Sequence, residues 1–176
     1  MARVKTNQGA KGRRKLDGVF RSADQLRDRG DLTAAFSLFL KGAKAGDRSC
    51  QLNVGYCYDI GSGTRPSRSK AFHWYRWAYR SGDASAANNI GTIWRDRQDA
   101  PRALFWFRRA LALGDIDANL EIARIHLKTR LSKARAVPYL LRVLKSGSVT
   151  QASKEDAGRM LRELRSRVVE VQLKGV

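Results

Sequence analysis

The dipeptide Gly-Asp recurs along the chain at nearly even spacing, and this repeat narrows the possible folds more than any other feature of the sequence. The pairs begin at Gly46, Gly82 and Gly114, so successive pairs are 36 and 32 residues apart. Gly147, which is followed by Ser148, lies 33 residues further on and marks a fourth register point. Periods of this length indicate stacked pairs of helices, none of which can bury its apolar face alone.

The residues before each of the four glycines predict a helix, which we call the A helix of its repeat. Positions eleven, seven and four residues before the glycine are apolar or small, and these offsets lie on one face of a helix with 3.6 residues per turn. The positions hold Ala35, Phe39 and Gly42, then Ala71, Tyr75 and Ala78, then Ala103, Phe107 and Ala110, and finally Ala136, Leu140 and Val143. We therefore expect every A helix to bury the same stripe.

The residues after the first three glycines predict a second helix, the B helix of each repeat. The positions four, eight, nine and eleven residues after the glycine hold Cys50, Val54, Gly55 and Cys57, then Ala86, Ile90, Gly91 and Ile93, then Ala118, Ile122, Ala123 and Ile125. The glycine can adopt the left-handed conformation that ends an A helix, and the aspartate can cap the free N–H groups of the B helix. The sequence therefore predicts antiparallel helix pairs joined by tight turns.

Three segments share a more detailed pattern, with an aromatic-rich A helix, an alanine-spaced turn and a glycine-containing B helix. They read AFSLFLKGAKAGDRSCQLNVGYCYDIGSG at residues 35–63, AFHWYRWAYRSGDASAANNIG at residues 71–91 and ALFWFRRALALGDIDANLEIA at residues 103–123. This pattern resembles that of the Sel-one-like repeat (SLR) family, whose repeats are tetratricopeptide-related helical hairpins. In the third segment Glu121 replaces the asparagine found at Asn53 and Asn89, and the fourth repeat is degenerate.

The resemblance implies an all-α fold, an α-solenoid of three to four stacked antiparallel helix pairs with a capping helix at each end. We expect a disordered basic tail over residues 1–15, an N-terminal capping helix over residues 16–30, the repeat solenoid over residues 31–147, and a C-terminal capping helix and tail over residues 148–176. Ser153 and Asp156 have the spacing of a capping box and are predicted to start that last helix.

The chain is strongly basic, with 35 Lys and Arg against 16 Asp and Glu and a net charge of +19. The tail contributes six of the cations and no acid, so the rest of the chain keeps a large positive excess. Such a charge favours an anionic partner. No apolar run is long enough to form a secretory signal or to span a bilayer, so we expect a cytoplasmic protein without a membrane partner.

The segment GSGTRPSRSK, residues 61–70, has the glycines, hydroxyls and lysine of a phosphate-binding loop. Such a loop follows a strand and places Gly-Lys-Ser/Thr at the start of a helix, where free N–H groups converge on phosphate. This segment follows a B helix and contains Pro66. We therefore interpret it as the loop between two repeats, with Ser67 or Ser69 capping the next helix.

No combination of side chains predicts catalysis or a metal site. Cys50 and Cys57 fall on the buried stripe, where other repeats have Ala or Ile, so we interpret them as core residues rather than metal ligands or a redox pair. His126 takes the position of Tyr58 and Trp94 and is interpreted as structural. No set of Ser, His and Asp and no isolated carboxylate pair stands out. We expect a protein that is not an enzyme, uses no cofactor and has no small-molecule substrate.

A second stripe remains on each A helix once the buried positions are assigned. It lies nine, five and two residues before the glycine, is bordered by the position six before it, and mixes cations with aromatic rings. The candidate partner-binding residues are Lys41, Lys44, His73, Arg76, Trp77, Arg80, Phe105, Arg108, Arg109, Arg142 and Lys145. In tetratricopeptide-type folds the A helices line the concave surface that holds partners, and the resemblance implies the same here.

Two classes of partner fit this stripe. The first is an acidic protein or peptide, bound by an adaptor, chaperone or immunity-type protein, because rows of cations steer an acidic chain and buried aromatic and Arg side chains anchor interfaces. The second is nucleic acid, bound by the basic groove and the N-terminal tail through phosphate contacts and base stacking. A third interpretation is that these residues are solvated charges without a partner, and composition alone does not separate the three.

Overall fold

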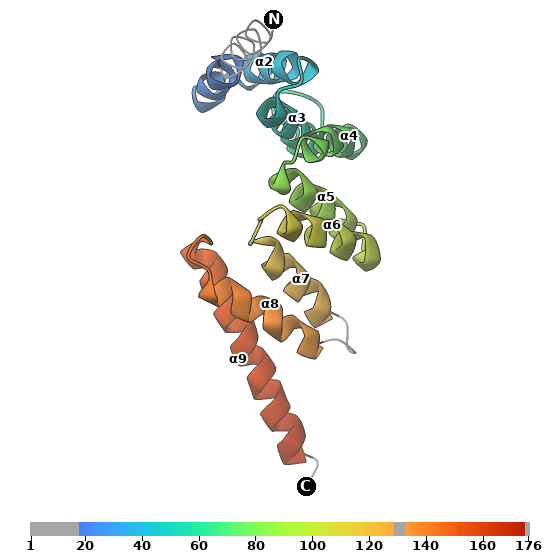
Figure 1. The fold of residues 1–176 in the computed structure, drawn as a ribbon, viewed down its shortest axis with the longest axis vertical. Coiled ribbons are helices and arrows are strands. Elements are labelled where there is room, and N and C mark those ends of the chain that lie inside the picture. The colour runs from blue at the N-terminus through green and yellow to red at the C-terminus, as the bar shows by residue number, and fades with distance from the viewer. Residues whose placement is uncertain (1–17, 129–132, 175–176) are drawn as a thin grey trace, which may run out of the picture. The chain divides into compact units, whose positions relative to one another are not determined.

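The computed structural model describes residues 18–128 and 133–174, and within these ranges every regular element is an α-helix (Figure 1). A first helix covers residues 18–28 of the predicted capping segment, and the predicted tail over residues 1–15 lies outside the described residues. The A helices are α2 (Leu32–Lys44), α4 (Arg68–Arg80), α6 (Ala100–Ala112) and α8 (Lys133–Lys145). The B helices are α3 (Arg48–Ile60), α5 (Ala84–Asp96), α7 (Ala118–Lys128) and α9 (Gln151–Lys174).

The chain divides into two compact units between Ala86 and Ala87. In unit 1, which ends at Ala86, α3 packs against both α2 and α4. In unit 2, α7 packs against both α6 and α8, and α8 packs in turn against α9. Both α3 and α7 thus lie against the A helix of their own repeat and the A helix of the next, which is the arrangement expected of stacked pairs.

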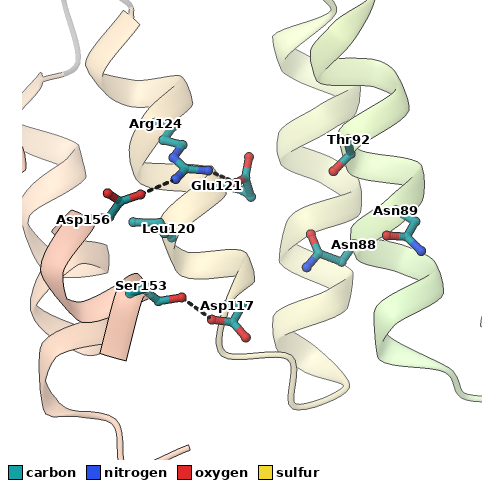
Figure 2. Close-up of a pocket in the computed structure, with 10 residues that line it drawn as sticks. Asn88, Asn89, Thr92, Asp117, Leu120, Glu121, Arg124, Ser153 and Asp156 are labelled. Carbon is teal, nitrogen blue, oxygen red and sulfur yellow. Dashed lines mark hydrogen bonds and ion pairs between the residues drawn. The ribbon is translucent and has the colours of Figure 1, made fainter. Parts of the chain in front are cut away.

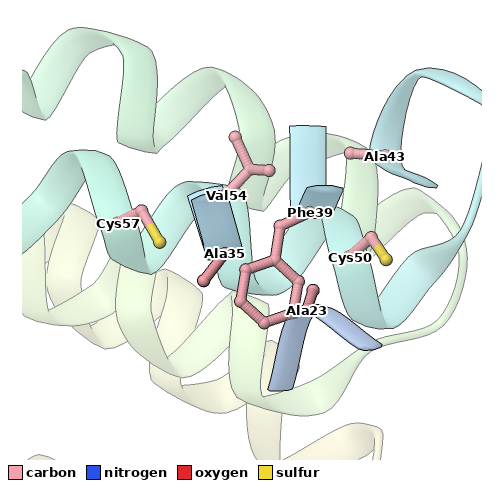
Figure 3. Close-up of a cluster of buried hydrophobic side chains, with 7 residues drawn as sticks. All are labelled: Ala23, Ala35, Phe39, Ala43, Cys50, Val54 and Cys57. Carbon is pink, nitrogen blue, oxygen red and sulfur yellow. The ribbon is translucent and has the colours of Figure 1, made fainter. Parts of the chain in front are cut away.

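The predicted buried stripes form the cores of both units. In unit 1 a cluster joins Ala23 of the first helix with Ala35, Phe39 and Ala43 of α2 and Cys50, Val54 and Cys57 of α3 (Figure 3). In unit 2 a cluster joins Leu120, Ala123, Ala136, Leu140, Val143, Val149 and Ala157. The apolar positions predicted for the A and B helices are buried in all repeats, so the register inferred from the glycines is confirmed.

The predicted turns are confirmed at all three Gly-Asp pairs. Their glycines have φ angles of 90°, 83° and 95°, in the left-handed region. The carboxylate of Asp47 accepts a hydrogen bond from the N–H of Cys50 at 2.6 Å, and Asp83 accepts one from Ala86 at 2.9 Å. Each aspartate therefore satisfies a free N–H group at the start of a B helix.

The fourth register point behaves differently from the other three. Gly147 does not adopt the left-handed conformation, and α9 begins at Gln151 with the hydroxyl of Thr150 accepting from the N–H of Ser153 at 3.1 Å. The predicted capping box of Ser153 and Asp156 is therefore wrong. No aspartate follows Gly147, and the side chain that caps the helix is the hydroxyl of Thr150, three residues later.

The segment over residues 61–67 is a loop between repeats, as predicted. Gly61 ends α3 with a φ of 81°, and the Ser67 hydroxyl accepts from the N–H of Lys70 at 3.4 Å to start α4. Gly63 has a φ of 68°, and a Cβ at this position would lie 2.0 Å from the carbonyl oxygen of Leu32. Gly63 thus allows a close approach of the loop to α2.

Candidate partner-binding face

The eleven candidate binding residues are all exposed in the structure. They lie on α2 and α4 in unit 1 and on α6 and α8 in unit 2, and we call the exposed sides of these four helices the A face. Trp77 and Phe105 are 45% and 49% exposed, respectively. Large aromatic side chains are usually more buried than this, so packing within the fold does not account for these two rings.

In unit 1 the aromatic part of the A face is organised along α4. The indole Nε1 of Trp77 donates a hydrogen bond to Nε2 of His73 at 2.9 Å, and the guanidinium of Arg80 lies 5.4 Å from the centroid of the Trp77 ring. The guanidinium of Arg76 lies 5.9 Å from the Phe72 ring. Each pair joins residues three or four positions apart, so the helix itself holds these side chains together.

In unit 2 the same kind of pairing occurs on α6 and α8. The guanidinium of Arg109 lies 4.4 Å from the Phe105 ring centroid, and that of Arg142 lies 5.6 Å from the Tyr139 ring. Tyr139 stacks in turn on His126 of α7, with ring centroids 5.8 Å apart. Sequence reasoning missed Tyr139, although it lies eight residues before Gly147, where the second and third repeats have tryptophan.

The A face is cationic because charges are segregated between the two kinds of helix. The sequences of α2, α4, α6 and α8 contain two, four, three and four Lys or Arg residues and no Asp or Glu. The B helices carry carboxylates, and the Gly-Asp turns carry more. This signal was available in the sequence, since it appears when charges are counted by helix type rather than over the whole chain. The A helices therefore contribute cations and no acid to the A face.

His126 has the structural role predicted for it. His126 lies on α7, and its side chain is 6% exposed. Burial, together with repulsion from Arg108 and Arg135, lowers its pKa below the ordinary value of 6.5. Burial and neighbouring cations both disfavour the charged form of an imidazole, so His126 stays neutral in the folded state to a lower pH.

Acid should therefore weaken unit 2. The unfolded chain takes up a proton at His126 more readily than the folded chain does. The free energy of unfolding is therefore at its full value above the ordinary pKa of histidine and declines as the pH falls below it. Urea unfolding of the chain and of a His126→Phe variant, compared between about pH 8 and about pH 5.5, should show a smaller decline for the variant. An equal decline in both would exclude His126 as its source.

The two cysteines have the properties of core residues. Cys50 and Cys57 are free and buried, and burial raises the pKa of both thiols, with Asp47 adding to the shift at Cys50. Raised pKa values disfavour the thiolate that metal binding and redox chemistry require. Among the residues that the structure describes, no group of three or more metal-ligating side chains comes together. None of the described helices is long and apolar enough to cross a membrane.

A polar pocket of about 370 Å³ lies on the B helices of unit 2, away from the predicted residues (Figure 2). Asn88, Asn89 and Thr92 of α5 line one side of it. The other residues of the lining are Asp117, Leu120, Glu121, Arg124, Ala152, Ser153 and Asp156. Sequence reasoning did not identify this pocket, because its lining joins residues from helices that are far apart in the chain.

The charges of this pocket pair with one another and with residues beside it. The Arg124 guanidinium lies between Glu121 and Asp156, donating to the latter at 2.7 Å (Figure 2). Glu121 also accepts from Arg95, and Asp156 from Arg159. Glu121, the departure from the asparagine of the other repeats, is thus explained by two arginine partners. These ion pairs join α5, α7 and α9, and the A face remains the candidate binding surface.

Comparison with known proteins identifies the repeats. The model of the Sel1 repeat family matches residues 23–47, 48–83 and 84–115. The chain belongs to the Sel1 repeat family. The first Sel1 repeat begins within the predicted capping helix, and the degenerate fourth repeat lies beyond the matched residues. Sel1 repeats generally serve as protein-interaction modules rather than as catalysts.

Solved structures share this architecture. A Sel1 repeat protein from Oxalobacter formigenes is 29% identical, with a TM-score of 0.55 over 62% of this chain and 47% of its own. The protein c5321, a protective antigen of uropathogenic Escherichia coli strains with an SLR fold, is 16% identical, with a TM-score of 0.67 over 86% of this chain and 38% of its own. MamA is 19% identical, with a TM-score of 0.60 over 84% and 88%.

This Sel1 chain spans less than half the length of the first two of these proteins. At such low identity, the likeness to c5321 and MamA shows the fold alone. That fold is the predicted all-α solenoid of stacked helix pairs. No curated protein matches the chain. The chemistry of the A face therefore carries the information on the partner of these Sel1 repeats.

Proposed function

We propose that this Sel1 repeat protein is a non-catalytic interaction module whose A face binds an acidic segment of another protein, in an adaptor, chaperone or immunity-type role. The observation that carries the proposal is the segregation of charge, with thirteen cations and no carboxylate on the four A helices. Trp77 and Phe105 stand exposed among these cations. A protein partner also agrees with the general role of the family.

The pairing of rings and guanidiniums suits the recognition of carboxylates. A guanidinium can accept a carboxylate through two parallel N–H donors, and such bonds are stronger than neutral ones. Arg80 and Arg109 already lie over Trp77 and Phe105. The two arginine side chains therefore lose less conformational freedom when they bind a partner. Aromatic and Arg side chains are also those that most often dominate binding energy at interfaces.

The same pairing favours an acidic protein over nucleic acid. Single-stranded nucleic acids gain affinity by stacking bases on exposed aromatic rings. Here Arg80 and Arg109 already lie over one face of the two exposed rings. Nucleic acid therefore gains less by stacking on these rings than it would on uncovered rings, whereas the cations above them remain able to bind carboxylates.

Selection of binders from a library of random peptides, with the full chain as bait at physiological ionic strength, tests the proposal. We expect the selected peptides to be acidic. A Trp77→Ala, Arg109→Glu double variant, which changes the A face in both units, should bind them at least about tenfold more weakly while keeping its helical circular dichroism signal and melting temperature.

The matched control is a Tyr56→Ala, Arg165→Glu double variant. It removes an exposed ring on α3 and reverses an exposed cation on α9, both outside the A face. This variant should bind the selected peptides as the unchanged chain does. Selected peptides without acidic bias, or equal losses in the two variants, would contradict the proposal. An oligonucleotide that displaces the peptides at physiological ionic strength would assign the face to nucleic acid instead.

A further inference from the structure

The A face of unit 2 exposes aliphatic side chains as well as cations. On α8, Leu141 is 42% exposed and Leu144 is 37% exposed. Each is followed directly by a cation, Arg142 and Lys145, which are exposed as well. Residues three or four apart share a side of a helix, so Leu141 lies beside Leu144 and Lys145 on the exposed surface of α8. On α2 the residue at the position of Leu144 is the buried Ala43, so this apolar exposure is a property of α8 rather than of every repeat.

Both α6 and α8 pack on α7, within unit 2. Arg108 of α6 and Arg135 of α8 both help to lower the pKa of His126 on α7. Tyr139 of α8 stacks on the same imidazole and lies beneath the guanidinium of Arg142. Because α6 and α8 pack on the same helix within one compact unit, a single partner segment can contact exposed side chains of both.

We infer that the A face of unit 2 binds an acidic segment that also carries large apolar side chains, with Leu141 and Leu144 contacting those side chains while Arg142 and Lys145 engage the carboxylates. This inference rests on the proposed function and specifies the partner further. A purely polyanionic partner leaves Leu141, Leu144 and Phe105 in contact with water. A segment with Leu, Ile or Phe among its acids buries them, and burial of apolar surface is the main favourable term in most protein association.

Three synthetic peptides of equal length test this inference against the full chain by fluorescence anisotropy. The first combines Asp and Glu with Leu and Phe, the second keeps the acids and replaces Leu and Phe with Ser, and the third keeps Leu and Phe and replaces the acids with Lys. We expect the first to bind, the second to bind at least about tenfold more weakly and the third not to bind, since burial of one leucine is worth about tenfold or more in affinity.

A Leu141→Ser, Leu144→Ser variant should lower affinity for the first peptide to that of the second, and should leave affinity for the second unchanged. The matched control is a Tyr56→Ser, Ile60→Ser variant, because these side chains are 46% and 57% exposed on α3 and lie off the A face. The control variant should bind both acidic peptides as the unchanged chain does.

The outcomes separate this inference from the proposed function. Equal binding of the two acidic peptides would overturn the inference and leave the proposed function intact, whereas binding of neither would count against both. Sedimentation of the full chain tests the other possible occupant of the leucines. If the Leu141→Ser, Leu144→Ser variant converts a dimer into a monomer, the leucines join two copies of this chain and the inference is wrong.

Discussion

A Gly91→Ala variant should be less stable than the unchanged chain by about 2 kcal/mol, although alanine is the better helix former. A Cβ at this position would lie 2.7 Å from two ring carbons of Phe107, whose side chain is fully buried. Overpacking of this severity costs about 3 kcal/mol, and replacing a glycine within a helix recovers about 1 kcal/mol of it. The expected change can be measured by urea unfolding followed by circular dichroism.

The next repeat indicates how this loss can be reversed. In the register of Gly91 and Phe107 it has Ala123 and Leu140, which belong to one core cluster. A Gly91→Ala, Phe107→Leu variant should therefore be more stable than the sum of the two single changes predicts, because leucine leaves room for the new methyl group. Gly147→Ala is the control, since a Cβ there meets nothing within 4 Å. Simple additivity in the double variant would show that the ring is not the obstacle.

A Gly42→Ala variant should be destabilised by a similar amount, about 2 kcal/mol, because of contact with a cysteine rather than a ring. The Cβ of alanine would lie 2.4 Å from Sγ and 3.1 Å from Cβ of Cys50. The equivalent pairs in the second and third repeats consist of two alanines, Ala78 with Ala86 and Ala110 with Ala118. The first repeat accommodates the larger thiol at the B helix by having glycine on the A helix.

A Gly42→Ala, Cys50→Ala variant recreates the alanine pair of the other repeats. It should return to within about 1 kcal/mol of the unchanged chain, while Cys50→Ala alone loses stability through the space that it leaves. Thermal unfolding followed by circular dichroism would show the recovery, since a change of about 1 kcal/mol moves the melting temperature of a chain of this size by about 2–4 °C. A double variant no more stable than Gly42→Ala would rule out the thiol as the cause.

Much of the fold could be predicted because its determinants are local and periodic. Tyr75, Phe107 and Leu140 occupy the same place in their helices and are all buried, as their common offset from the glycine indicates. The start of α9 was predicted incorrectly because the fourth repeat lacks the Gly-Asp pair, which removes the signal on which the register rests.

The candidate site was predicted in part. The exposure of Trp77 and Arg109 follows from the same register, since residues that do not face a neighbouring helix face solvent. The stacking of Tyr139 on His126 and the pairing of Arg124 with Asp156 could not be predicted in this way. These contacts join residues of different helices, and no spacing along the chain reports which side chains meet there.

The sequence by itself determined the helices, their turns, the buried stripes and the absence of acid from the A helices. Each of these depends on residues within a few turns of one another, where helical periodicity and backbone conformation set the outcome. The tertiary structure alone decided which small residues permit close packing, as at Gly42 and Gly91, and which apolar residues stay exposed, as at Leu141 and Leu144. Both depend on the distance and shape of a neighbouring helix, and those are set only when the repeats stack.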